Sequence, residues 1–257
     1  MYFELKKHCD SIGVDFLSTP FSEKEADLLN EIDIPFFKVA SMDINNYRLL
    51  KYLAEFQKPI VLSTGMSTIS EIDKAIKVVE STGNFNIVLL HCISIYPPKY
   101  EDIHLNNIHM LNETFGYPVG FSDHTLGFSI PLAAIAKGAC IVEKHFTIDK
   151  NLPGWDHEIS ADSNEMRTIC KEGENIYKAL GEKTRTVSLQ EEEKKIKFRR
   201  SAVASKNLKK GKIIDEKDIL YKRPGSGLSP DLEVLIIGRK LNRDIDKDIL
   251  FSLDNFE

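Results

Sequence analysis

The sequence has no apolar run long enough to cross a membrane and no apolar leader at its start. A membrane-spanning helix needs about 20 consecutive apolar residues, and a secretory signal needs an apolar core of about 7–15 residues. Neither pattern occurs in the 257 residues. We therefore expect a protein that does not insert into membranes and that works in the cytoplasm.

The chain also lacks an excess of positive charge. The chain has 34 lysines and arginines against 39 aspartates and glutamates, for a net charge of −5. A negative protein is not attracted to nucleic acids or to anionic membrane surfaces. We therefore expect no nucleic-acid partner, and any anion site must be a local cluster of cationic, hydroxyl and backbone N–H groups.

The cysteines are few and show no pairing pattern. Cys9, Cys92, Cys140 and Cys170 are widely spaced, and no C-x-x-C sequence occurs. Such spacing is typical of reduced thiols in a cytosolic protein rather than of a disulfide framework or a zinc site. Cys92 and Cys140 lie in or beside apolar runs, so we interpret them as core side chains.

Short apolar runs that alternate with amphipathic stretches are the main feature of the first 181 residues. Continuously apolar runs are typical of parallel strands covered by helices, and a repeat of about 20–30 residues is typical of a (β/α) barrel. A closed barrel of this kind needs eight strands. The six predicted strands are residues 14–17, 35–40, 59–62, 86–90, 118–121 and 139–142.

The chain also opens in a predicted helix, residues 1–11, rather than in a strand. We therefore expect an α/β fold in which a TIM-type (β/α) barrel, residues 1–181, lacks its first two strand–helix units. Residues 182–200 are polar and dense in charge, which is typical of a linker. The short runs of residues 201–257 predict a separate, small β-rich domain.

Polar side chains follow the predicted strands, and the carboxyl ends of parallel strands meet at one rim of a barrel. His124 follows one strand, and Glu143 and His145 follow the next. Glu143 and His145 are two positions apart, so on a strand they share a face. Two neutral imidazoles suit a divalent ion that acts as a Lewis acid. The alternative is two rim histidines bonded to carboxylates, because two histidines alone are a weak metal signature.

A possible anion pocket lies at the same rim. Lys38, Ser41, Ser63 and Ser122 all follow predicted strands. One ammonium, several hydroxyls and helix N-termini can bind a phosphate or a carboxylate. Each serine could instead be only the N-cap of the following helix.

Two further features of the rim allow more than one interpretation. Glu143 could transfer a proton or orient a water, or it could be a structural partner of Lys38 or Lys144. His91 and Cys92 could form a base and a nucleophile. Because adjacent strand residues point to opposite faces, we interpret Cys92 as a core residue instead.

Taken together, these segments resemble the sialic acid synthase family, which makes N-acetylneuraminate and related nonulosonates. The tail resembles that family's C-terminal SAF (antifreeze-like) domain through residues 222–225 (KRPG) and 238–240 (GRK). The resemblance covers nearly the whole chain, in the family's order. In the barrel it rests on residues 16–22 (FLSTPFS), 37–41 (FKVAS), 62–66 (LSTGM), 90–92 (LHC) with 96–97 (YP), 122–127 (SDHTLG) and 143–147 (EKHFT).

The resemblance implies condensation of phosphoenolpyruvate with an open-chain N-acylated hexosamine, which gives a nine-carbon 2-keto acid and phosphate. His124 and His145 would bind Mn²⁺ or Mg²⁺, and Glu143 would act beside them. Arg223 would reach the sugar from the other subunit of a domain-swapped homodimer. Phosphoenolpyruvate would contact Thr19, Lys38, Ser41, Ser63 and Ser122, and the sugar would contact Ser94, Tyr96, Glu143 and Asp156.

Three departures from the family pattern leave questions open. The first two strand–helix units are missing, so this chain alone is expected to be weakly active or inactive. Ser94 stands where the family commonly has an asparagine, and Gly154-Trp155-Asp156 stands where it has Gly-Pro-Asp. The identities of the sugar substrate and of the nonulosonic acid product therefore stay open. The alternatives are another phosphoenolpyruvate or aldol-type barrel lyase, and a truncated, non-catalytic family member.

Overall fold

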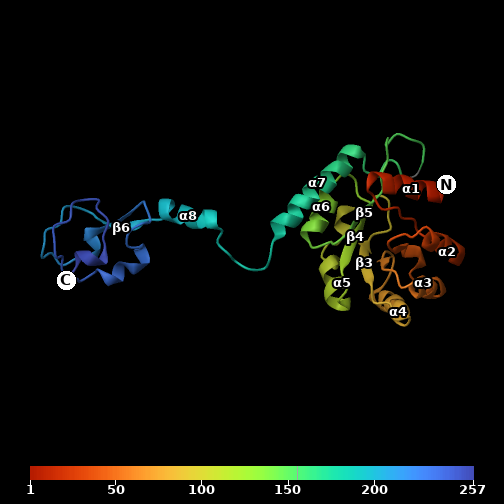
Figure 1. The fold of residues 1–257 in the computed structure, drawn as a ribbon, viewed down its shortest axis with the longest axis horizontal. Coiled ribbons are helices and arrows are strands. Elements are labelled where there is room, and N and C mark those ends of the chain that lie inside the picture. The colour runs from red at the N-terminus through yellow and green to blue at the C-terminus, as the bar shows by residue number, and fades with distance from the viewer. Residues whose placement is uncertain (155) are drawn as a thin grey trace. The chain divides into compact units, whose positions relative to one another are not determined.

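The computed structural model describes residues 1–154 and 156–257 (Figure 1). The chain forms two compact units, Met1–Gly181 and Glu182–Glu257. Among the described residues, no helix combines the length and apolar character needed to cross a bilayer.

The first unit is built on one parallel sheet whose strands follow one another in chain order. Each neighbouring pair is parallel; for example, Ser122 of the fourth strand pairs with Cys92 of the third and with Glu143 of the fifth. All carboxyl ends therefore lie at the same rim. The strands are β1 Phe37–Val39, β2 Ile60–Ser63, β3 Ile87–Cys92, β4 Val119–Asp123 and β5 Val142–Lys144.

The connecting segments carry helices, and Figure 1 shows them flanking the sheet. Several begin at caps that the sequence encodes. The Ser22 side chain accepts from the Glu25 N–H, and Thr68 with Glu71 forms a full capping box. The helices are α1 Tyr2–Ile12, α2 Glu23–Glu31, α3 Tyr47–Glu55, α4 Ile69–Glu80, α5 Asn107–Phe115, α6 Ser129–Ala136 and α7 Ser163–Leu180.

The core lies between the sheet and these helices. Leu50 and Leu53 of α3 are fully buried, as are Phe37 and Leu62 of the sheet. Apolar area removed from water is the main favourable term in folding, about 25 cal/mol per Å². This packing holds the strand ends, and therefore the rim, in place.

The described sheet has five strands, not six. The predicted strand at residues 14–17 has no regular secondary structure and no ladder bonds: the Val14 N–H bonds back to the Cys9 carbonyl, where Gly13 in the left-handed conformation ends α1. Val14 and Leu17 are exposed. An apolar run becomes a strand only when a neighbouring strand forms hydrogen bonds with its N–H and C=O groups, and β1 does not pair with this run.

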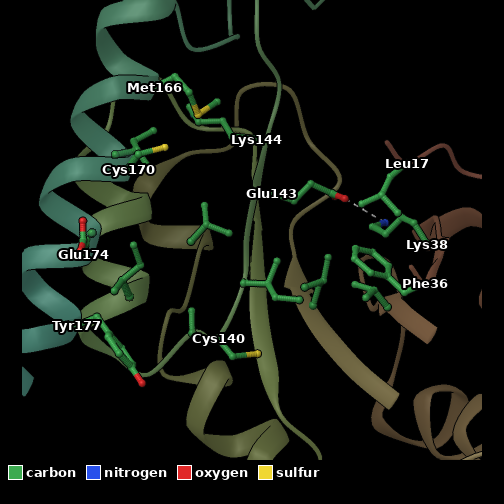
Figure 2. A pocket seen from close by; sticks show the side chains of 18 of the residues that line it. Leu17, Phe36, Lys38, Cys140, Glu143, Lys144, Met166, Cys170, Glu174 and Tyr177 are labelled. Atoms are coloured by element: carbon green, nitrogen blue, oxygen red, sulfur yellow. Dashed lines mark ion pairs between the residues drawn. The ribbon is translucent and has the colours of Figure 1, made fainter. Parts of the chain in front are cut away.

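The two edges of the sheet, β1 and β5, face a groove rather than each other (Figure 2). This cavity of about 760 Å³ has Phe36 on the β1 side and Tyr177 of α7 on the other. Cys140 and Cys170 also line it, and both are exposed. The prediction that Cys140 is a core residue is therefore wrong, because the described part of the chain places no segment over it at this edge.

The second unit is small. Its antiparallel strands β6 Ser201–Ala204 and β7 Ile219–Lys222 pack with Phe251 and other apolar side chains into a core of their own. The region expected to be a linker, residues 182–200, contains helix α8, Leu189–Phe198, which begins with a capping box at Ser188. Short 3₁₀ helices complete the described elements: Ser41–Asp43 and Tyr100–Asp102 in the first unit, and Glu216–Asp218, Pro230–Leu235 and Leu253–Asn255 in the second.

Candidate active site

A cavity of about 500 Å³ lies at the carboxyl ends of the five strands. Ten of the twelve predicted site residues line it, although they come from different parts of the chain. Their roles stay predictions, but their gathering follows from the parallel topology. They are Thr19, Lys38, Ser41, Ser63, Ser94, Tyr96, Ser122, His124, Glu143 and His145.

The two histidines that follow β4 and β5 lie side by side. Their ring centroids are 5.3 Å apart and the rings are inclined by 49°. Nδ1 of His124 lies 3.0 Å from the Ile93 carbonyl oxygen. A carbonyl only accepts, so Nδ1 carries the proton and Nε2 keeps its lone pair. Burial also lowers the pKa of His124, which keeps the ring neutral near pH 7.

These features fit a divalent metal ion. A metal-binding imidazole is neutral, and its second nitrogen is usually bonded to a carbonyl or a carboxylate, as in His124. Among the described residues, no group of three or more His, Cys, Asp or Glu side chains is arranged as a metal site, so the two imidazoles would be the protein ligands. Mg²⁺ and Mn²⁺ accept such sites, because water and substrate oxygens fill the remaining positions.

The predicted anion pocket is centred on Lys38. Its ammonium donates to the Ser63 hydroxyl over 2.8 Å and to the Val39 carbonyl over 3.1 Å. Beside it, the Gly65 N–H donates to the Ser41 hydroxyl over 3.0 Å. Neither serine caps a helix in the structure, so the alternative that they are N-caps is wrong for Ser41 and Ser63.

Gly65 was not singled out from the sequence, although its neighbours leave no room for a side chain. A Cβ atom at this position would lie 2.4 Å from the Ser94 hydroxyl and 2.7 Å from the Ser41 hydroxyl. The residue must be glycine for these two hydroxyls to approach the same point. The signals for it in the sequence were its place shortly after a predicted strand and its position in the LSTGM motif, residues 62–66.

Glu143 lies between the cationic and hydroxyl groups of the pocket. Its Oε1 accepts from the Ser122 hydroxyl over 2.6 Å, and its Oε2 lies 3.5 Å from the Lys38 ammonium (Figure 2). The side chain is 42% exposed. Glu143 is thus a partner of Lys38 and is also accessible to a bound molecule, whereas the Lys144 ammonium bonds to Asp123 and to the Thr125 carbonyl instead.

Cys92 is buried, as predicted for a core residue, but its side chain lies on the cavity face of β3 and that of His91 on the opposite face. Cys92 lines the cavity, 3.9 Å from the Ser94 hydroxyl. His91 points away from it, and its Nε2 lies 2.6 Å from the Ile103 carbonyl in a buried environment. The alternation was right, but a shift of one residue at a strand end exchanges the two faces. A base–nucleophile pair is ruled out because the two side chains diverge.

Tyr96 forms one wall beside the imidazoles. Its ring centroid lies 4.1 Å from that of His124 and 5.9 Å from that of His145, and burial raises its pKa.

Asp156 does not line the cavity, but its Oδ2 lies 3.8 Å from Nδ1 of His145, too far for a hydrogen bond. Trp155, part of the departure noted in that loop, lies outside the described residues.

Arg223 belongs to the second unit, in the loop after β7. Its guanidinium carbon lies 5.2 Å from the centroid of the Phe198 ring, a cation–π contact within that unit. The arginine is therefore held by a small folded unit of its own.

A buried ion pair next to the histidines was also missed. Lys144 Nζ lies 2.5 Å from Asp123 Oδ2, and the two side chains are 2% and 0% exposed. Each residue directly precedes a site histidine. The sequence signal was present, because strand alternation sets both side chains on the opposite face from Ser122 and Glu143, yet their pairing depends on the register of β4 and β5.

Comparison with known proteins places this site in a family. A model described as the NeuB family matches residues 1–185, and a SAF domain model matches residues 199–257. The chain belongs to the NeuB family. The second unit carries its SAF domain.

Relatives in the family carry names of three nonulosonate synthases. N,N'-diacetyllegionaminic acid synthase of Campylobacter jejuni is 39% identical over 96% of this chain and 75% of its own length. Pseudaminic acid synthase of Helicobacter pylori is 36% identical over 99% and 74%. The crystal structure of N-acetylneuraminic acid synthetase from Leptospira borgpetersenii, in complex with citrate, is 37% identical, with a TM-score of 0.71 over 75% of this chain and 67% of that one.

Proposed function

We propose that this protein condenses phosphoenolpyruvate with the open-chain form of an N-acylated hexosamine to give a nonulosonic acid and phosphate, as a step in surface polysaccharide or glycan biosynthesis. The observation that carries the proposal is the single cavity that brings together Lys38 and its hydroxyl partners, the Glu143 carboxylate and two imidazoles. The names of the relatives support the product class.

In the proposed reaction, C3 of the enol phosphate forms a bond to the aldehyde carbon of the sugar, and the aldehyde oxygen becomes a hydroxyl. Water adds at C2, and the C2–oxygen bond to phosphate breaks, which leaves the 2-keto acid. Lys38, Ser63 and Ser41 hold the phosphate and carboxylate of the substrate by charge-assisted hydrogen bonds. Ser122 and Glu143 lie where a water can be oriented and a proton accepted.

A divalent ion, Mn²⁺ or Mg²⁺, bound by His124 and His145 would polarise the aldehyde as a Lewis acid. The protein supplies a neutral ring for it: His124 is buried and its Nδ1 is committed to a carbonyl. Tyr96 packs against this ring and limits its rotation. Thr19, Ser94 and Asp156 complete the substrate contacts that we propose, the last two on the sugar side.

We further propose that the five strands are part of an eight-stranded barrel and that additional strand–helix units close it between β1 and β5. The support is the groove between these two edges, whose lining is mostly apolar, and the unpaired outer side of each edge strand. Arg223 would contact the sugar bound in the partner subunit of a homodimer, a role that suits a residue carried by a separately folded unit.

The experiment is an assay of phosphate release from phosphoenolpyruvate with a panel of N-acylated hexosamines and Mn²⁺, with the sugar product identified by mass spectrometry. The chain is assayed alone and together with a fragment that supplies the further strands. We expect activity in the complemented sample, and its loss in His124→Ala and in Lys38→Ala. No phosphate release with any acceptor would contradict the proposal and favour another barrel lyase.

A non-catalytic role is the second candidate, because the groove leaves the site open on one side. Isothermal titration with phosphoenolpyruvate separates the two. Binding of phosphoenolpyruvate to the wild type that disappears in Lys38→Ala supports a competent anion pocket. Absence of a binding heat in both the wild type and Lys38→Ala supports the non-catalytic role.

A further inference from the structure

One buried ion pair lies directly beside the two histidines and has no part in the mechanism proposed above. Asp123 ends β4 and Lys144 ends β5, and they are paired opposite each other in the sheet. His124 and His145 follow them by one residue each. The pair therefore joins the two strand ends at the last position before the imidazoles.

The pair also determines the conformation of the chain on both sides of His124. The Asp123 carboxylate accepts from the Thr125 N–H over 3.0 Å and from the Thr125 hydroxyl over 3.1 Å. The Lys144 ammonium donates to the Thr125 carbonyl over 2.6 Å, in addition to Asp123. The residues before and after His124 are thus held by one network, and Thr125 is 1% exposed.

The burial of this network argues that it is more than a surface contact. Exposed ion pairs contribute little, whereas a pair removed from water is costly unless its polar atoms are matched, so a matched buried pair resists rearrangement. Asp123 accepts from three donors here and Lys144 donates to two acceptors. Both residues border the cavity at the strand ends, and the Lys144 ammonium is directed toward Asp123 and the Thr125 carbonyl.

We propose that the Asp123–Lys144 ion pair is a positioning unit that holds the two imidazoles at the separation at which one divalent cation binds both. The inference rests on the proposed function, since it concerns the same metal. In this role the pair contacts neither substrate nor metal. It acts through the backbone at the ends of β4 and β5, in the way that partners outside the ligand sphere orient the ligands of metal sites.

The test uses the double variant Asp123→Asn/Lys144→Met. Both replacements keep the approximate size of the side chain, and the amide oxygen introduced by Asp123→Asn can still accept from Thr125. Removing both charges together avoids an unpaired buried charge, and such a replacement is often close to neutral for stability. The single variant Asp123→Asn is measured alongside it. Mn²⁺ binding is followed by the electron paramagnetic resonance signal of free Mn²⁺, and folding by calorimetry.

The matched control is Asp218→Asn in the second unit. Asp218 is a fully buried carboxylate that pairs with two lysines, Lys206 and Lys212, but it is distant in sequence from the histidines and belongs to a separate unit. We expect the double variant to fold and to bind Mn²⁺ at least about tenfold more weakly than the wild type. We expect the control to bind it with unchanged affinity.

Each outcome bears on a different claim. If the double variant folds and binds Mn²⁺ as tightly as the wild type, the positioning role is overturned while the proposed function stands. If the wild type itself does not bind Mn²⁺, the metal part of the proposed function fails, and the positioning role is then decided by histidine NMR of the metal-free protein. Ring signals of His124 and His145 that shift or broaden in the double variant support it, and unchanged signals overturn it.

Discussion

The two units of this protein each bury a carboxylate completely, and they stabilise it in different ways. In the first unit, Asp123 pairs with a lysine that is itself 2% exposed. In the second unit, Asp218 pairs with Lys206 and Lys212, whose side chains are 62% and 37% exposed. Asp123 therefore has a single counter-charge, which is itself buried, in addition to its hydrogen bonds from Thr125, whereas the two counter-charges of Asp218 lie at the surface.

This difference shows what each carboxylate contributes. Asp218 caps the 3₁₀ helix Glu216–Asp218 from its last position by accepting from the Asp215 N–H, and so it closes a local turn. Asp123 joins two strands through a bond between residues 21 positions apart in the sequence. The first kind of contact stabilises a turn, and the second fixes the geometry of a site.

The largest expected effect comes from breaking the buried pair on one side. Lys144→Met leaves the Asp123 carboxylate buried without a counter-charge, and removal of one partner from a buried pair typically costs about 3–5 kcal/mol. We expect the calorimetric transition of the first unit to move to lower temperature or to be lost, and that of the second unit to stay. A Lys144→Met protein as stable as the wild type would show that water reaches Asp123 and would remove the contrast between the two units.

A smaller effect is expected from Asp218→Asn. The lysines that face Asp218 return to water with little penalty, so the loss is that of charged hydrogen bonds, about 2 kcal/mol. Hydrogen exchange measured on peptides of residues 201–257 reports it. Lys206→Gln, which removes only one exposed partner, serves as the comparison and should have a smaller effect than Asp218→Asn. Equal effects of both variants would mean that one lysine carries the whole interaction.

The smallest effect is a pH dependence confined to the second unit. Burial by itself raises the pKa of Asp218, but the hydrogen bonds from Lys206 and Lys212 outweigh it and leave the pKa below its usual value of 3.8. The stability that comes from this group is therefore present above the unfolded pKa and is lost as pH falls through the lower native value. The melting temperature of the second unit should fall less steeply between about pH 5 and pH 2 in Asp218→Asn than in the wild type; equal slopes would contradict the assignment.

Several features of the fold were predictable because they depend on neighbours in the sequence. Ser22 and Thr68 cap helices through bonds that span three residues. The apolar runs at residues 59–62 and 86–90 became β2 and β3 because continuously apolar segments between helices suit a covered parallel sheet. His124, His145 and Glu143 gather at one rim because the carboxyl ends of parallel strands all lie at the same side of the sheet.

Other features were not predictable, because they depend on which segments lie beside one another. Residues 14–17 have the composition of a strand and lack a pairing partner in the described sheet. Cys140 has the surroundings of a core residue in the sequence and lies on an open groove. Cys92 faces the cavity rather than the helices, since the phase of alternation at a strand end is decided by register with the neighbouring strand.

The amino-acid sequence by itself determined the order of strands and helices, the family to which the chain belongs and the residue types at the rim, because periodicity, caps and motifs are local properties. Only the tertiary structure decided that Asp123 lies against Lys144, that Gly65 leaves room for two hydroxyls, and that the rings of His124 and His145 lie 5.3 Å apart. These are distances between segments far apart in the chain, and the register of parallel strands sets them.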